Sequence, residues 1–134
     1  MSYETVVPVW NALRERFTKM AAGLTEKQLD LSIGESSIRG LLYHTAEVEY
    51  MFADWYLGKP MDGELPKATT LEELVDLLNA SDENLKQALQ GLTEEQWHVP
   101  VESKMGASTP LEVVGRLMYH AGIHSGQIAL IKKQ

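Results

Sequence analysis

The 134-residue sequence contains no cysteine and only two phenylalanines. The absence of thiols excludes disulfides, thiolate metal sites, iron–sulfur clusters and a cysteine nucleophile, so any metal ion must be held by nitrogen or oxygen ligands. No apolar run reaches the roughly 18 residues of a membrane span, and the N-terminus lacks the basic segment and apolar block of a secretory signal. These absences predict a cytoplasmic protein that does not contact membranes.

Positive charge is also scarce in the sequence. Lys and Arg together number 12 against 19 Asp and Glu, which gives a formal net charge of −7. Such a chain repels phosphate backbones, and no basic run offsets the repulsion, so nucleic acid is not expected as a partner. The contents of 44% hydrophobic and 23% charged residues are typical of a globular protein. The length predicts one domain over residues 1–134.

Apolar residues recur at spacings of three and four through most of the chain, which predicts an all-α fold. The first helix is expected from Thr5 to Ala22, with Gly23 ending it. Its apolar stripe is expected to comprise Val9, Leu13, Phe17 and Met20. Three cations are expected largely on its solvent side: Arg14, Arg16 and Lys19.

The second helix is expected to begin at Ser36 or Ser37, whose hydroxyls can cap it, and to end at Leu57 before Gly58. One face of this helix combines a histidine with large apolar side chains, because offsets of three, four, seven and eight return to the same side. That face comprises Leu41, His44, Val48, Phe52 and Trp55.

Two further helices follow. The third begins near Thr70, which forms a capping box with Glu73, and runs to Gly91. Its apolar stripe comprises Leu74, Leu77, Leu78, Leu85 and Leu89. The fourth is capped by Thr109, has Pro110 at its first position and extends to about Lys132. Four amphipathic helices in one short chain predict a four-helix bundle.

Residues 23–29 (GLTEKQL) and 91–97 (GLTEEQW) resemble each other. Each segment follows an odd-numbered helix and precedes an even-numbered one. Two explanations remain open: Gly and Thr chemistry common to many turns, or duplication of a helical hairpin.

His120 and His124 lie one turn apart on the same face of the last helix, a spacing that allows two imidazoles to bind one metal ion. The apolar stripe through Leu117 and Ile128 contains both, which predicts that they point inward. His44 lies about eight residues into the second helix, and His124 about eight residues from the end of the fourth. Antiparallel helices would bring all three to one level, and parallel helices would bring them within a turn or two.

Glu47 follows His44 by one turn, and Gln127 follows His124 by one turn. Each can hold the second nitrogen of an imidazole or touch a bound ligand, so both are candidate catalytic residues, with solvated side chains as the alternative. A core role is preferred for four aromatic residues that could instead line a pocket: Tyr43, Tyr50, Trp55 and Tyr119. His98 precedes Pro100 in an expected turn and is left outside the site.

Three neutral imidazoles around a divalent ion leave at least one coordination position open, as in catalytic metal sites. Imidazole suits zinc, nickel, iron and copper, with zinc and nickel preferred here. Such an ion favours the deprotonated form of bound water or thiol near neutral pH. The alternative is three structural histidines that bind no metal.

The segments 42–47 (LYHTAE) and 120–128 (HAGIHSGQI) resemble the DinB-like family of metal-dependent enzymes. The resemblance covers nearly the whole chain and is strongest in the His-x-x-x-His-x-Gly-Gln ending. It implies a four-helix bundle connected up-down-down-up. It also implies a metal ion held by His44, His120 and His124.

Members of that family include transferases and isomerases that use low-molecular-weight thiols such as bacillithiol or mycothiol. The resemblance therefore implies an enzyme that activates such a thiol, or water, toward a small-molecule substrate, by thiol S-transfer or hydrolysis. It also implies a homodimer. The metal is expected to be zinc or nickel, with iron as a further option. The alternative function is a non-catalytic dimeric bundle that binds a metal or small ligand.

Overall fold

The computed structural model describes residues 1–134 and contains four long helices. These are α1 (Ser2–Ala22), α2 (Ile38–Leu57), α3 (Leu71–Gln90) and α4 (Pro110–Ile131). The shorter elements are η1 (Lys27–Asp30), β1 (Ser32–Ile33), β2 (Ser36–Ser37) and η2 (Gln96–His98). The predicted all-α bundle is confirmed, although the small β1–β2 antiparallel hairpin was not expected. None of the helices combines the length and hydropathy that a transmembrane span requires.

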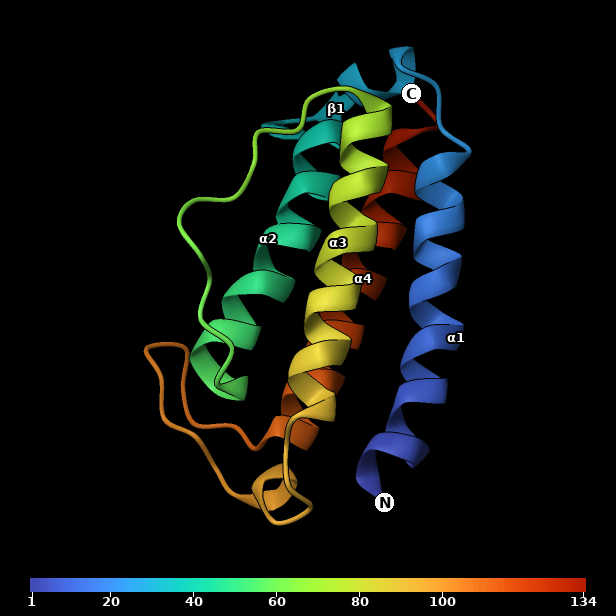
Figure 1. The fold of residues 1–134 in the computed structure, drawn as a ribbon. Coiled ribbons are helices and arrows are strands. Elements are labelled where there is room, and N and C mark those ends of the chain that lie inside the picture. Colours follow the sequence, from blue (N-terminus) through green and yellow to red (C-terminus); the bar gives the residue numbers. More distant parts are fainter.

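The helices are connected up-down-down-up (Figure 1). Helix α1 packs against α3 and α4, and α2 packs against the same two helices. The segment 58–70 returns along the bundle, so α2 and α3 run in the same direction. Thirteen residues can span about 43 Å when extended, whereas the 20 residues of α2 rise only about 30 Å. The connection is therefore long enough, and α4 runs antiparallel to α2.

Side-chain caps define the start of three helices as predicted. The Ser37 hydroxyl accepts a hydrogen bond from the Gly40 amide at the start of α2. Helix α3 begins with the reciprocal capping box that was predicted at Thr70. Thr109 forms an equivalent box with Glu112 before α4. These local bonds satisfy backbone amides that lack a partner within the helix.

The two similar segments adopt the same local structure. The amide of Thr25 donates to the Gln28 side chain, and the amide of Gln28 donates to the Thr25 hydroxyl. Thr93 and Gln96 repeat this pair. The last residue of each segment, Leu29 in the first and Trp97 in the second, is buried. The shared Thr-x-x-Gln pair explains the resemblance locally, whereas duplication of a hairpin stays a prediction.

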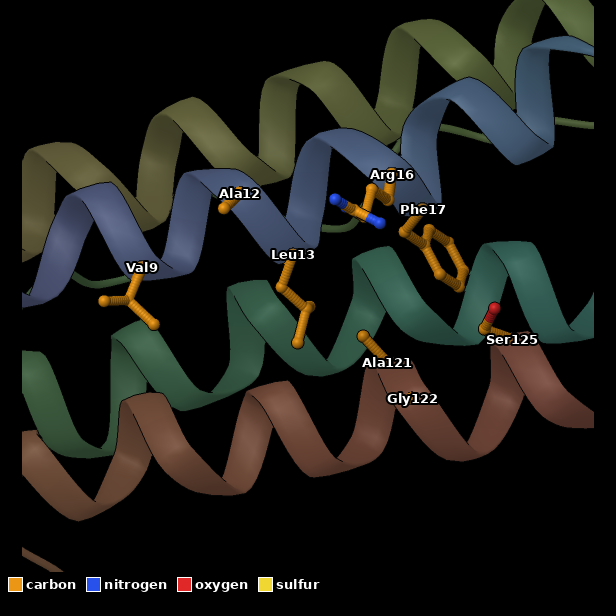
Figure 2. A pocket seen from close by; sticks show the side chains of 8 residues that line it. All are labelled: Val9, Ala12, Leu13, Arg16, Phe17, Ala121, Gly122 and Ser125. Atoms are coloured by element: carbon orange, nitrogen blue, oxygen red, sulfur yellow. The ribbon is translucent and has the colours of Figure 1, made fainter.

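The apolar stripe predicted for α3 is buried, but the stripe predicted for α1 is wrong in part. Val9 is 59% exposed and lines a hollow of about 420 Å³ between α1 and α4 (Figure 2). The buried side of α1 comprises Val7, Trp10, Arg14, Phe17 and Ala21. These residues also have spacings of three and four, so the sequence contains two possible buried stripes for this helix, and spacing alone does not select between them.

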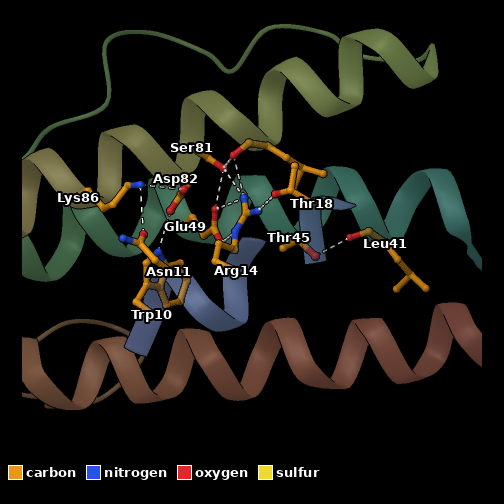
Figure 3. Close-up of polar contacts among 11 residues, drawn as sticks. Trp10, Asn11, Arg14, Thr18, Leu41, Thr45, Glu49, Ser81, Asp82 and Lys86 are labelled. Atoms are coloured by element: carbon orange, nitrogen blue, oxygen red, sulfur yellow. Dashed lines mark hydrogen bonds and ion pairs between the residues drawn. The ribbon is translucent and has the colours of Figure 1, made fainter. Parts of the chain in front are cut away.

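The prediction that Arg14 faces solvent is also wrong. Its side chain is fully buried between α1, α2 and α3, where its guanidinium meets the Glu49 carboxylate through two hydrogen bonds of 2.7 and 3.0 Å (Figure 3). It also donates to the carbonyl of Leu78 and the hydroxyl of Thr18. The Ser81 hydroxyl donates to the same carboxylate at 2.7 Å. The position is tolerated because the charge has both a counter-ion and hydrogen-bond partners.

The Arg14–Glu49 pair neutralises the buried charges and also fixes the relative position of α1 and α2. Burial raises the pKa of the Glu49 carboxyl, while the Arg14 guanidinium and the Ser81 hydroxyl act in the opposite direction. The bidentate geometry needs both groups at one height of the bundle. Because the residues belong to different helices, the pair disfavours any sliding of α1 along α2.

Replacing Glu49 by Gln is expected to lower the free energy of unfolding by about 3–5 kcal/mol, because the guanidinium would stay buried without its counter-ion. Urea denaturation followed by circular dichroism measures the change. The double variant Arg14→Met/Glu49→Met should recover most of the loss, since no charge is then buried. A Glu49→Gln protein within about 0.5 kcal/mol of wild type would contradict this role.

Candidate metal centre

Three histidines that are distant in sequence meet between α2 and α4. His44 lies in the second turn of α2, His120 lies at the middle of α4, and His124 lies one turn further along α4. One ring nitrogen from each lies within 4.8 Å of the others. The ring centroids of His44 are 5.1 Å from His120 and 5.5 Å from His124, and those of His120 and His124 are 4.2 Å apart. The antiparallel packing of α2 and α4 therefore brings together the three histidines that the sequence singled out.

Neighbouring side chains orient two of the three imidazoles. The Nδ1 of His44 lies 3.1 Å from the Glu47 carboxylate, and the Nδ1 of His124 lies 2.7 Å from Oε1 of Gln127. These oxygens only accept hydrogen bonds, so each Nδ1 carries the proton and each Nε2 presents a lone pair. The Nε2 atoms of His120 and His124 are 3.0 Å apart. Glu47 and Gln127 thus contact histidine rings, and we assign them positioning roles.

The surroundings of the two α4 histidines, His120 and His124, favour the neutral form of their imidazoles. Burial, together with the proximity of His124 and His44, lowers the pKa of His120 to about 4. Burial also lowers the pKa of His124, although its hydrogen bond with Gln127 acts in the opposite direction. Neutral imidazoles are the form that coordinates metal ions. At neutral pH the α4 pair therefore needs no proton loss before it can bind one.

The cluster lies at the edge of the bundle and opens toward solvent. His124 is only 9% exposed, whereas the side chain of His44 is 49% exposed. The inward orientation predicted from the α4 stripe holds for His124, while the expectation that His44 shares the buried face of Val48 and Phe52 is only partly correct. This exposure leaves a route by which a small molecule can approach the three nitrogens.

The remaining candidates lie elsewhere. His98 lies in η2, at the other end of the bundle, where its Nε2 is 3.0 Å from Glu94. Tyr119 is 74% exposed, and Tyr50 and Trp55 line two separate cavities. The hydroxyl of Tyr43 donates to the carbonyl of Pro66. These aromatic residues therefore do not gather into one pocket beside the histidines.

Arg116 is a residue near the site that the sequence did not single out. It lies one turn before His120 on α4, and its guanidinium lies 4.8 Å from the centre of the Phe52 ring. It donates to the hydroxyls of Tyr56 and Ser108 and to the carbonyl of Met105. Arg116 thereby fixes the segment before α4 against α2. Its i, i+4 spacing to His120 was the only available signal, because its partners come from other segments.

The donor set fits a divalent metal ion. Three neutral imidazoles are a common set for zinc and suit nickel and iron as well. Zinc–nitrogen distances of about 2.0–2.1 Å require the three ligand atoms to lie closer to one another than 4.8 Å, so the rings must move together when an ion binds. The hydrogen bonds at Nδ1 of His44 and His124 are the outer contacts that metal-binding histidines usually make. The residues present could therefore hold a metal through Nε2 atoms, with room left for another ligand.

Comparison with known proteins gives one family and several similar structures. The sequence profile of the DinB superfamily matches residues 10–128. A crystal structure of a DinB-like protein from Bacillus cereus has a TM-score of 0.83 at 20% identity, over 98% of this chain and 91% of that protein. The DinB-like protein YjoA from Bacillus subtilis gives a TM-score of 0.77 at 19% identity, over 96% and 90%.

A conserved protein from Enterococcus faecalis is also similar, with a TM-score of 0.65 at 21% identity over 98% of this chain and 93% of that one. Comparison with curated protein sequences gives no significant match. At these identities the solved structures establish the shared fold alone.

The metal-free protein is expected to lose stability as the pH falls from 6.5 toward 4. The unfolded chain has the ordinary histidine pKa of 6.5, whereas the folded chain has a pKa of about 4 at His120. In this interval the unfolded state binds more protons, so the free energy of unfolding decreases with decreasing pH. Thermal denaturation at several pH values, with chelator present, measures the effect. His120→Gln should show a shallower decrease, and equal decreases in both proteins would contradict the assignment.

Proposed function

The chain belongs to the DinB superfamily, and on that basis we propose that it is a metal-dependent enzyme whose ion is held by His44, His120 and His124. The superfamily is associated with metal binding. The observation that carries the proposal is the convergence of three imidazole nitrogens within 4.8 Å at an open edge of the bundle. Zinc or nickel fits this all-nitrogen set best, and iron is the next option.

When bound, a divalent ion at this position supplies a Lewis acid that favours the deprotonated form of a thiol or water. The protein's own residues supply the rest of the site. Glu47 and Gln127 hold two imidazoles in one tautomer, and the buried His124 anchors the cluster to α4. The exposed side of His44 leaves space for a small molecule.

A low-molecular-weight thiol is the preferred nucleophile. The chain has no cysteine to supply sulfur, so a thiol substrate must bring its own. In thiol S-transfer the sulfur loses its proton to solvent, forms a bond to an electrophilic carbon and displaces the leaving group with its electron pair. Hydrolysis replaces the thiol by water. Both reactions use small-molecule substrates, in agreement with the open edge beside His44.

A non-catalytic metal-binding or ligand-binding bundle is the second candidate. One observation favours it: the carboxylate nearest to the histidines, Glu47, is already hydrogen-bonded to His44. A general acid or base needs a proton-transfer group within reach of the substrate, and Glu47 can serve only if that bond breaks. Activity measurements with metal-loaded protein separate the two candidates.

Protein purified without a polyhistidine tag and dialysed against zinc is expected to hold one ion per chain. Each of His44→Ala, His120→Ala and His124→Ala should lower the affinity by at least about 100-fold, because two imidazoles remain. Isothermal titration calorimetry and elemental analysis measure the loss. His98→Ala is the matched control, since this histidine lies outside the cluster, and it should bind as wild type. Retention of the ion by all three cluster variants would refute the site.

Metal-loaded protein is expected to consume a low-molecular-weight thiol in the presence of an electrophile such as an epoxide or alkyl halide. Thiol loss with chromatographic detection of the thioether measures the reaction, and an ester panel tests hydrolysis. Wild-type rates should exceed those of the chelated protein and of His120→Ala by at least about 100-fold. If one ion binds per chain but no thiol or water reaction depends on it, the binding candidate is favoured.

A further inference from the structure

Two cationic side chains, Lys104 and Arg116, lie on aromatic rings of the last two turns of α2. The ammonium of Lys104 is 4.7 Å from the centre of the Trp55 ring, and the guanidinium of Arg116 is 4.8 Å from the centre of the Phe52 ring. The centroids of these two rings are 6.0 Å apart. The two cations therefore occupy one small region, to which the segment 99–109 brings Lys104 (Figure 1).

Neither cation has an acidic partner. None of the ion pairs in the structure includes Lys104 or Arg116. Glu112 lies one turn before Arg116 on α4, but its carboxylate accepts the hydrogen bond from the Thr109 amide in the capping box. In a chain with 19 acidic residues and a net charge of −7, two neighbouring cations without a carboxylate form a local positive site.

The positive site lies on the same outer edge of the bundle as the histidine cluster. One side of α2 carries four residues at spacings of four and three, which return to the same face. On α4, Arg116 precedes His120 by one turn, and each of the two contacts a ring of α2. We call these residues, together with Lys104, the α2–α4 edge. The four residues that α2 contributes are His44, Val48, Met51 and Trp55.

The two ends of the α2–α4 edge are separated by the length of a small molecule. Phe52 and Trp55 follow His44 by eight and eleven residues, which correspond to about 12 and 16 Å along α2. A ligand contact of roughly 2–3 Å at each end leaves roughly 7–11 Å for the ligand itself. Between the ends lie the buried Val48 and the partly buried Met51, neither of which carries a charge.

We propose that Lys104 and Arg116 bind an anionic group of the substrate, so that the site selects thiols that carry a carboxylate. The inference rests on the metal-dependent thiol function proposed above and adds the charge of the substrate. A thiol held at the histidines would place a carboxylate about 7–11 Å away at the two cations. A thiol without an anionic group would lack this contact.

Both cations retain donors for such a ligand. Arg116 makes three hydrogen bonds within the protein, which leave two of its five guanidinium donors free and hold the group in place. The side chain of Lys104 is exposed and makes no hydrogen bond, so its ammonium can turn toward a carboxylate. Charge-assisted bonds of this kind are among the stronger polar contacts in proteins.

Glutathione and its diethyl ester are a matched pair of probes, because they share one thiol and one backbone and differ only at two carboxylates. Isothermal titration calorimetry with zinc-loaded protein should give a Kd for glutathione at least about 10-fold lower than for the ester. The net charge of −7 acts in the opposite direction, since it attracts the cationic ester. Tighter binding of glutathione therefore reports a local contact, and equal affinities would overturn the proposal.

The variant Lys104→Glu tests the contribution of one cation. It should bind glutathione about 10-fold more weakly than wild type and the ester at least as tightly. Lys19→Glu makes the same charge change on the exposed side of α1, so it is the matched control and should bind both probes as wild type. Circular dichroism verifies that both variants fold. A Lys104→Glu protein that binds glutathione as wild type does would overturn the proposal.

Metal-free protein separates this inference from the proposed function. S-methylglutathione has no free thiol, so its contact with the two cations needs no metal ion. Chelated protein should broaden its NMR lines more than those of its diethyl ester, and Lys104→Glu should remove the difference. This result without zinc-dependent binding of glutathione would support the cation site and contradict the metal-dependent function. Zinc-dependent thiol binding without any preference for carboxylates would overturn the cation site alone.

Discussion

The antiparallel packing of α2 against α4 is the constraint on which the histidine cluster depends. His44 stands near the start of α2, and His120 and His124 stand from the middle of α4 toward its end, so opposed helices bring all three to one height. The long return segment 58–70 makes this possible, because it lets α3 run parallel to α2 and leaves α4 to run the other way (Figure 1). The connectivity of the bundle therefore determines that the three histidines lie together.

The buried Arg14–Glu49 pair fixes the position of α1 relative to α2 and α3. Apolar stripes alone tolerate small shifts of one helix along another, whereas a bidentate ion pair loses its hydrogen bonds when either helix moves. The pair connects α1 to α2, and the Leu78 carbonyl and Ser81 hydroxyl extend the contact to α3. On its opposite side α2 carries His44. The network thus holds in place the helix that contributes His44 to the candidate site.

Much of the fold could be predicted because the signals are local. Serine and threonine caps and the leucine stripe of α3 depend only on neighbours within one helix. Burial of Arg14 could not be judged in this way, because its counter-ion comes from another helix. A signal was nevertheless present: Arg14 interrupts the stripe Val7, Trp10, Phe17, Ala21, and Glu49 interrupts the buried side of α2. Opposite charges on two apolar stripes are a usable sign of a buried pair.

The residues of the candidate site were predictable, whereas their exposure was not. Periodicity gives the side of a helix that a residue occupies. The exposure of a residue at the edge of the bundle also depends on how far apart α2 and α4 lie, which periodicity does not give. The most direct test of the account is the X-ray absorption spectrum of the zinc-loaded, untagged protein. We expect three imidazole nitrogens at about 2.0–2.1 Å, with the imidazole scattering reduced in His44→Ala. A spectrum with oxygen ligands only would contradict the proposal that the bundle joins three histidines into one metal centre.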